Sequence, residues 1–439
     1  MSPSRTTADL LSQLIRFDTT NPPGSEGECV RFLESLLRDA GLSTELLEKS
    51  PDLPNLVARL PGRGEAPPLL LYGHADVVTT AGQTWSRPPF AGDVVDGWVW
   101  GRGALDMKGG LAMMASALVR AHEEALRPAG DVVFAVLADE EAGGTDGARF
   151  LVERHPDAFE GIRYALGEFG GFPLHIGGRR FYMIQVAEKQ PCWIEATIRA
   201  PGGHGARPVR GGAMATLARI LTALDRKRTP VHVTPVTRRM VETFAEHVSL
   251  PKRIALQLLL RPRLTDRILR LLGPTGETFE PLFRHTVNAT IVRGGEKSNV
   301  VPSEIVLGLD ARILPGFDPD DLLDELRNLI HEALDVRILL HDAPSPESDF
   351  GLFEPLGRIL GELDPGSISV PLLLPASTDA RHFAQLGIQT YGFTPMRLPA
   401  GFDFFSTIHA ADERIPIEAL DFGAEALYRV ITQYRGSKD

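Results

Sequence analysis

The chain has 439 residues, of which 43% are hydrophobic and 23% are charged, and its formal net charge is −11. A chain of this length is expected to form two domains, and this composition excludes a disordered protein. The negative charge argues against a nucleic acid or an anionic membrane as a partner, and no apolar run is long enough to span a bilayer.

The N-terminal residues and the cysteines indicate a compartment. No apolar signal core follows Met1, and only two cysteines, Cys29 and Cys192, are present. Two cysteines provide neither a disulfide framework nor a zinc knuckle. We therefore expect a cytoplasmic protein, in which any metal would be held by His, Asp and Glu side chains.

The first part of the chain predicts a succession of helices and strands. Apolar residues at helical spacing predict the helices, and short continuous apolar runs predict buried strands. The expected helices span residues 6–17, 26–40 and 111–125, and the expected strands span residues 55–60, 69–72, 131–138 and 163–167. This alternation is typical of an α/β domain.

Three of these strands are followed closely by side chains that can bind a metal, namely His74, Glu141 and Glu168. Open α/β sheets bind ligands at the carboxyl ends of their strands, so the three side chains are expected at one edge. Gly73 is expected to let the chain turn as it leaves the sheet. A histidine by itself is more often an ordinary core or surface residue, so the argument depends on all of these groups together.

Two further segments add acids to this edge. Residues 101–110 form a glycine-rich loop that matches neither phosphate-binding motif and presents one acid, Asp106. Residues 139–141 are three consecutive acids. An acidic run is usually a solvated surface, but this one ends a buried strand, where a nearby cation would relieve the repulsion. Oxygen and nitrogen donors without a thiolate favour zinc, manganese or cobalt over magnesium or calcium.

The sequence pattern changes near residue 190. Residues 192–199 alternate between apolar and polar side chains, as a half-exposed strand does. The elements that follow have the β-α-β-β-α-β order of a ferredoxin-like domain, with residues 235–284 as a helix-rich insertion. They are expected at residues 212–224, 285–292, 304–313, 319–333 and 336–341.

The last part of the chain returns to an α/β pattern. It predicts a helix at 351–363, a strand at 389–393 and a helix from Ile417, with His409 before that helix as a fifth donor. A first domain that is interrupted by a second one explains why the donors lie so far apart. We expect a catalytic domain in two parts, 1–188 and 343–439, and an inserted lid and dimerisation domain at 189–342.

Several motifs, taken in order, resemble the di-zinc family of aminoacylase, carboxypeptidase G, acetylornithine deacetylase and succinyl-diaminopimelate desuccinylase. The resemblance covers nearly the whole chain, and its motifs are Gly73-His74-Ala75-Asp76-Val77-Val78, residues 101–110, Asp139-Glu140-Glu141, Gly202-Gly203-His204-Gly205, Asn299-Val300-Val301-Pro302, Thr378-Asp379-Ala380, and His409 with Glu413. It implies a mixed-sheet α/β exopeptidase domain with an inserted ferredoxin-like α+β lid and dimerisation domain.

The resemblance also implies the metal ligands and the base. Two zinc ions are expected, with cobalt or manganese as alternatives. One ion would be held by His74, Asp106 and Glu168, and the other by Asp106, Glu141 and His409. Asp76 would orient His74, and Glu140 would be the general base for a water shared by the two metals. The Asp106–Met107 peptide bond is expected to be cis.

Three residues of the inserted domain receive roles by the same resemblance. His204 would reach across a homodimer interface to stabilise the oxyanion in the partner's site. Relatives often carry serines where this chain has Gly205 and Ala206, and a solvated loop histidine is the alternative. Arg312 and Asn288 would bind a substrate carboxylate or carbonyl. For Arg312, a structural ion pair with Asp310 is an equal alternative.

Two features favour the acylamino-acid and carboxypeptidase side of this family, namely Glu168 and residues 391–396. We therefore expect hydrolysis of the amide bond of an N-acyl amino acid or of a small peptide with a free carboxylate. A dipeptidase or aminopeptidase of the same family is an alternative. From other classes, a non-catalytic binding relative would have lost a ligand or the base, and a serine or cysteine hydrolase would need a nucleophile motif that this chain lacks.

Overall fold

The computed structural model describes residues 6–332, 334–342 and 348–436. The chain forms two compact units. The first unit comprises Met1–Val186, Asp349–Leu372 and Thr378–Asp439, and the second comprises Ala187–Ser348 and Leu373–Ser377. The expected domain boundaries at 188/189 and 342/343 stay a prediction, and residues 343–347 lie outside the described part of the chain.

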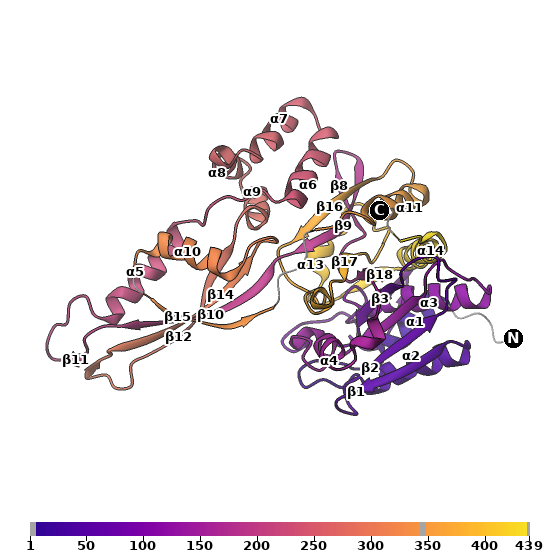
Figure 1. Cartoon of the computed structure of the whole chain (residues 1–439), viewed down its shortest axis with the longest axis horizontal. Helices are drawn as coiled ribbons and strands as arrows, with labels where there is room; N and C mark the ends of the chain where they lie inside the picture. The colour runs from indigo at the N-terminus through magenta and orange to yellow at the C-terminus, as the bar shows by residue number, and fades with distance from the viewer. Residues whose placement is uncertain (1–5, 333, 343–347, 437–439) are drawn as a thin grey trace. The chain divides into compact units, whose positions relative to one another are not determined.

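Within the described ranges, the first unit is built on a mixed sheet of nine strands (Figure 1). Along the sheet the order is β1-β2-β6-β3-β7-β17-β9-β16, and β8 pairs with β9. These strands are β1 (Ser43–Glu48), β2 (Pro54–Leu60), β3 (Leu69–His74), β6 (Val132–Leu137), β7 (Tyr164–Gly167), β8 (Phe172–Ile176), β9 (Arg179–Glu188), β16 (Ile368–Leu374) and β17 (Gln389–Gly392).

The centre of this sheet is parallel and buried. β3 pairs in parallel with β6 on one side and with β7 on the other, and every residue of these three strands is buried. Strands that are covered on both faces are expected to be continuous apolar runs, which is how they were recognised in the sequence. Because the three strands are parallel, their carboxyl ends meet at the same edge of the sheet.

Helices cover both faces of the sheet. α3 packs on β3 together with α1 and α14, whereas α4 and α12 pack together around a core that includes Leu70, Tyr72 and Val133. The helices of this unit are α1 (Thr7–Ile15), α2 (Gly27–Asp39), α3 (Lys108–Glu123), α4 (Ala148–Arg154), α11 (Phe353–Leu363), α12 (Ala380–Phe383), α13 (Phe404–Thr407) and α14 (Ile417–Gln433). Among the described residues, none of the helices combines the length and the apolar character that crossing a membrane requires.

A small antiparallel sheet joins two distant parts of the first unit. Its strands are β4 (Val94–Val95), β5 (Trp98–Trp100) and β18 (Arg414–Pro416). β18 pairs with β5, so that Arg414 lies opposite Trp100. This pairing fixes the segment that follows His409 beside the segment that leads to Asp106.

The second unit contains the predicted ferredoxin-like arrangement. The antiparallel strand order is β12-β14-β10-β15, and the chain order with the helices is β10-α5-β12-β14-α10-β15. α5 and α10 lie on one face (Figure 1), where side chains of all the central elements form the core of this unit. The elements are β10 (Gln190–Arg199), α5 (Ala213–Arg226), β12 (Thr286–Arg293), β14 (Glu304–Ile313), α10 (Pro319–Ile330) and β15 (Asp335–His341).

The insertion at residues 235–284 is helical, as predicted. It lies between α5 and β12 in the chain and consists of α6 (Pro235–Glu246), α7 (Leu250–Leu259), α8 (Pro262–Leu271) and α9 (Pro274–Phe279). A short pair of strands, β11 (Gly203–His204) and β13 (Val300–Val301), also belongs to this unit. The expected fold class, a mixed-sheet α/β unit with an inserted ferredoxin-like α+β unit, is therefore confirmed.

Candidate metal centre

The carboxyl edge of the central strands carries most of the predicted ligands. His74 is the last residue of β3, Glu141 lies in the short helix η1 (Glu140–Ala142) after β6, and Glu168 directly follows β7. Asp106 lies in the loop before α3, and His409 lies between α13 and β18. All five side chains belong to the first unit.

These five side chains form two groups that share Asp106. His74 Nε2 lies 3.1 Å from Asp106 Oδ1 and 3.4 Å from Glu168 Oε2. His409 Nε2 lies 3.0 Å from Asp106 Oδ2 and 3.2 Å from Glu141 Oε1. Each oxygen of one carboxylate thus faces a different histidine, as a carboxylate that bridges two cations would. That these residues bind metal stays a prediction.

Asp76 contacts His74 at Nδ1, the ring nitrogen that does not face Asp106. His74 Nδ1 lies 3.0 Å from the backbone oxygen of Asp76 and 3.3 Å from its Oδ1, so Nε2 points toward Asp106. The Asp76 carboxylate also accepts the backbone N–H groups of Glu140 (3.2 Å) and Glu141 (3.0 Å). One buried carboxylate therefore fixes the ring of His74 and the position of η1 together.

The charges of the cluster fit a cation. Hydrogen bonds with Asp106 and then Glu141 raise the pKa of His409 to about 10. Burial would lower the pKa of His74, but hydrogen bonds with three carboxylates raise it well above its ordinary value. Glu168 Oε1 is buried without a hydrogen-bond partner among the described residues, so it has a lone pair to offer. The carboxylates thus draw positive charge to the positions between them, and a divalent cation would supply that charge.

Glu140 lies beside His74 and Glu168, but in the described part of the chain it forms no ion pair with either histidine of the cluster. Single donor atoms of Glu140, His74 and Glu168 lie within 4.8 Å of one another. Burial, and after it the charge of Glu168, raise the pKa of Glu140 well above its ordinary value. A carboxyl group with a raised pKa can both accept and return a proton near neutral pH. The position and the environment of Glu140 are therefore suitable for proton transfer.

The loop that carries Asp106 is held by two residues for which the sequence predicted no role. Glu413 Oε1 accepts the N–H groups of Leu105 (2.8 Å) and Asp106 (3.2 Å), and its Oε2 accepts Arg102 Nη1 at 2.5 Å. Glu413 and Arg102 are both buried. Glu413 belongs to the family motif after His409, and that spacing was the only signal for it. The Asp106–Met107 bond is cis, as predicted.

The role expected for Gly73 was wrong. Gly73 lies within β3 and not in a turn, and it has no positive φ. A Cβ at this position would lie 2.3 Å from Met107 Cε and 2.7 Å from Met107 Sδ. The end of the Met107 side chain, next to Asp106, thus fills the space that the glycine leaves above the strand, and a larger residue at 73 would have to displace it.

His409 is supported differently from His74. Its φ is +59°, and its backbone oxygen accepts Gln83 Nε2 at 2.7 Å. Asp412, three residues later, accepts the N–H and the hydroxyl of Ser86 at 2.8 and 2.9 Å. The loop around residues 83–86 therefore positions the segment of His409 through its backbone.

The other predicted site residues belong to the second unit. His204 is exposed, and its Nδ1 accepts the N–H of Ala206 at 3.1 Å, which leaves Nε2 as the donor. Arg312 donates two hydrogen bonds to Asp310, at 2.9 and 3.2 Å, and one to Ser377 at 3.2 Å. Asn288 is exposed and lies opposite Asp310 in the strand register. The ion pair with Asp310, which was the alternative for Arg312, is thus present. The roles expected for all three residues in the site stay predictions.

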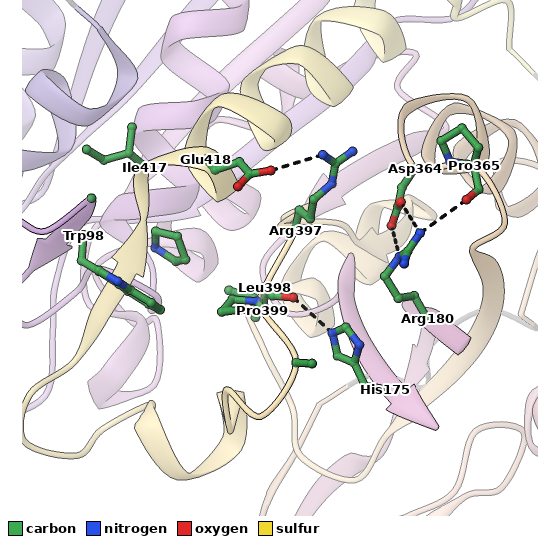
Figure 2. Close-up of a pocket in the computed structure, with 13 residues that line it drawn as sticks. Trp98, His175, Arg180, Asp364, Pro365, Arg397, Leu398, Pro399, Ile417 and Glu418 are labelled. Atoms are coloured by element: carbon green, nitrogen blue, oxygen red, sulfur yellow. Dashed lines mark hydrogen bonds and ion pairs between the residues drawn. The ribbon is translucent and has the colours of Figure 1, made fainter. Parts of the chain in front are cut away.

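A cavity of the first unit, with a volume of about 1030 Å³, is lined by none of the predicted ligands. Figure 2 shows that its charged side chains already pair with each other. Arg180 donates two hydrogen bonds of 2.6 Å to Asp364, and Arg397 pairs with Glu418 at 3.3 Å. Because its charges are paired, this cavity is a weaker candidate for the functional site than the cluster.

A second group of possible ligands, in the second unit, is not suited to a metal. It consists of His232, His285 and Glu325. The N–H of Leu314 donates to His285 Nδ1 at 3.1 Å. A neutral imidazole that accepts at Nδ1 carries its proton on Nε2, the nitrogen that faces Glu325, so that nitrogen has no free lone pair.

Comparisons with known proteins indicate a family for this chain. The sequence profile of the family described as "Peptidase family M20/M25/M40" matches residues 70–433. The chain is similar to Probable carboxypeptidase S-like 2 of Dictyostelium discoideum, with 28% identity over 364 residues, 80% of this chain and 68% of that protein. It is also similar to Aminoacylase-1 of Sus scrofa, with 26% identity over 405 residues, 88% of this chain and 86% of that protein.

Among solved structures, the M20 family metallo-carboxypeptidase Sso-CP2 from Sulfolobus solfataricus has a similar fold. The TM-score is 0.68 over 97% of this chain and 98% of that chain, at 17% sequence identity. At this identity the likeness concerns the fold.

Proposed function

This chain belongs to the peptidase family M20/M25/M40, and on that premise we propose that it is a zinc-dependent amidohydrolase. Its substrate would be an N-acyl amino acid or a small peptide with a free carboxylate. One observation carries the proposal, namely the pair of His–carboxylate groups that share Asp106 beside a separate Glu140. A shared carboxylate supports two cations, and a glutamate outside the groups remains free to move a proton.

The chemistry divides between the metals and the side chains. Zinc ions held by His74, Asp106 and Glu168 on one side, and by Asp106, Glu141 and His409 on the other, would lower the pKa of water and polarise the substrate carbonyl. Cobalt or manganese are alternatives with the same donors. Glu140 would take a proton from the attacking water and give it to the leaving amine. Asp76 would keep the proton of His74 on Nδ1, so that Nε2 presents its lone pair to the cluster.

Residues of the second unit would complete the site. We propose that His204 stabilises the oxyanion across a homodimer interface, and that Arg312 and Asn288 bind the substrate carboxylate or carbonyl. Relatives of this chain provide the support for the substrate class, because their names include an aminoacylase and a carboxypeptidase. The division into domains at 1–188, 189–342 and 343–439, and a cytoplasmic location, also stay proposals.

The test compares substrate classes with the metal-loaded protein. N-acetyl amino acids, dipeptides with a free carboxylate and aminopeptidase substrates with a blocked carboxylate would be offered with zinc, cobalt or manganese. We expect cleavage of the first two classes and loss of cleavage on chelation. Preferred cleavage of the blocked substrates would contradict the specificity and favour an aminopeptidase.

The same assay separates the proposal from a non-catalytic relative. A protein that only binds would take up metal but cleave none of the substrates. Activity that survives complete removal of metal would instead favour a serine or cysteine hydrolase.

A further inference from the structure

Helices α7 and α8 of the second unit carry a concentration of positive charge. Between residues 250 and 271 the sequence has six basic side chains and one acid, Asp266, in a chain with a net charge of −11. The six basic residues, all exposed, are Lys252, Arg253, Arg261, Arg263, Arg267 and Arg270. The one acid does not neutralise these six cations, because Asp266 pairs with the buried Arg284. This surface therefore departs from the charge of the rest of the protein.

Three of the arginines share one face of α8. Arg263, Arg267 and Arg270 stand at positions i, i+4 and i+7, which place them on one side of a helix. The opposite face holds Thr265, Ile268 and Leu269, which are buried. Like charges at i and i+4 repel each other, and no ion pair of Arg263 or Arg267 is present within the part of the chain that the structure describes. The arrangement costs stability unless an anion lies opposite it.

Large aliphatic side chains are exposed beside these cations. Leu271 is 77% exposed and follows Arg270 on α8. On α7, Leu250 is 69% exposed and Ile254 is 49% exposed, at positions i and i+4 of one face. Single exposed aliphatic side chains are ordinary, but here two leucines and an isoleucine are exposed on the same two helices that carry the six cations.

We propose that the surface of α7 and α8 docks on an anionic phospholipid membrane. The arginines would bind lipid phosphates, and Leu250, Ile254 and Leu271 would enter the interface between headgroups and acyl chains. A nucleic acid would use the cations but not the aliphatic side chains, which is why a lipid surface is favoured. The net charge of the whole chain predicted the opposite, because it averages over this local concentration. α7 and α8 are neighbours in the insertion (Figure 1), so both can face one surface.

The test uses the purified full-length chain and sedimentation with vesicles, without any activity measurement. The vesicles are phosphatidylcholine alone, or phosphatidylcholine with phosphatidylserine at about one lipid in three. We expect binding only to the anionic vesicles and its loss in high salt. The double variant Arg263→Glu/Arg267→Glu should weaken binding by about 25-fold or more, and Leu271→Ser by about tenfold.

The control makes the same change of charge elsewhere. Arg31→Glu/Arg38→Glu alters two exposed arginines of α2 in the first unit, and it should bind the vesicles like the unchanged chain. Circular dichroism would verify that all variants fold.

Four results would overturn the proposal. They are the absence of binding to anionic vesicles, equal losses in both double variants, unchanged binding of Leu271→Ser, and binding to an oligonucleotide or to polyglutamate in place of vesicles.

Discussion

The two histidines of the cluster are held in opposite ways. His74 ends a central strand, its side chain is 1% exposed, and its second nitrogen faces Asp76. His409 lies on a loop, its side chain is 46% exposed, and its support comes through the backbone, from Gln83. One half of the site is thus part of the core of the first unit, whereas the other half is attached to its surface.

The two halves should therefore differ in how tightly they hold a cation. A ligand that is fixed by strand pairing and a buried carboxylate needs little ordering when a cation binds, whereas a half-exposed ligand on a loop must be ordered. We expect the ion on the His74 side to be held more tightly than the ion on the His409 side. Four substitutions test this difference in metal affinity between the two halves, in order of decreasing effect.

Replacing the shared carboxylate should abolish the difference by removing both sites. In Asp106→Ala both histidines lose the oxygen that they face, at 3.1 and 3.0 Å. We expect the bound metal to fall below one ion per chain and the rate to fall by at least about 10⁴-fold, because the groups act as a unit. Metal analysis and an amidase assay are the measurements. Two ions retained per chain would show that Asp106 does not bridge.

Glu140→Gln should leave both halves intact and remove only the proton transfer. The variant keeps the size of the side chain but cannot accept a proton, so we expect a loss of about 10²–10⁴-fold in kcat with both metals retained. Metal analysis of the same sample separates this loss from loss of a cation. A rate equal to that of the unchanged chain would contradict the assignment of the base.

Asp76→Asn should weaken only the His74 half. The backbone oxygen of residue 76 still faces His74 Nδ1, but the amide removes the negative charge beside the ring and does not accept two backbone N–H groups equally well. We expect about a 10- to 100-fold loss of affinity for one metal ion. Titration with a chelator that removes the ions stepwise gives both affinities. An equal loss at both ions would mean that Asp76 acts through the general fold and not through His74.

Gln83→Ala should have the smallest effect, with the larger share on the His409 half. Gln83 Oε1 also accepts Arg102 Nη2 at 2.8 Å, so the change reaches the Asp106 loop more weakly through Glu413. It removes the hydrogen bond to the backbone oxygen of His409, which is worth about 0.5–1.5 kcal/mol, or roughly two- to tenfold in affinity. The same chelator titration should show the more weakly held ion leaving earlier and a smaller change for the other ion. A larger loss at the tightly held ion would reverse the order of the two halves that we infer.

The sequence predicted what depends on local pattern. β3, β6 and β7 were recognisable because a strand covered on both faces is a continuous apolar run, and the side chains after them necessarily meet at one edge. The ferredoxin-like order was readable for the same reason. β1 was missed because it has one buried residue, Leu47, and thus no apolar run.

Contacts between distant residues could not be read from the sequence. The bonds from Glu413 to the loop of Asp106 join residues 307 and 308 positions apart. The contact of Met107 with Gly73 depends on side-chain packing, so the glycine was interpreted as a turn. The pairing of Arg312 with Asp310 was predicted only as one of two alternatives, because alternate residues of a strand share a face.

The contact of Glu413 with the loop of Asp106 also sets an order of events during synthesis. A ribosome releases the strands of His74 and Glu168 long before it reaches Glu413, and the intervening second unit must emerge first. The nascent chain can therefore pair β3 with β6 and β7 early, but its Asp106 loop waits for Glu413, which follows the whole second unit. A chain that stops short of residue 413 would lack this contact with the Asp106 loop, and it would also lack α14, which packs with α3 over β3.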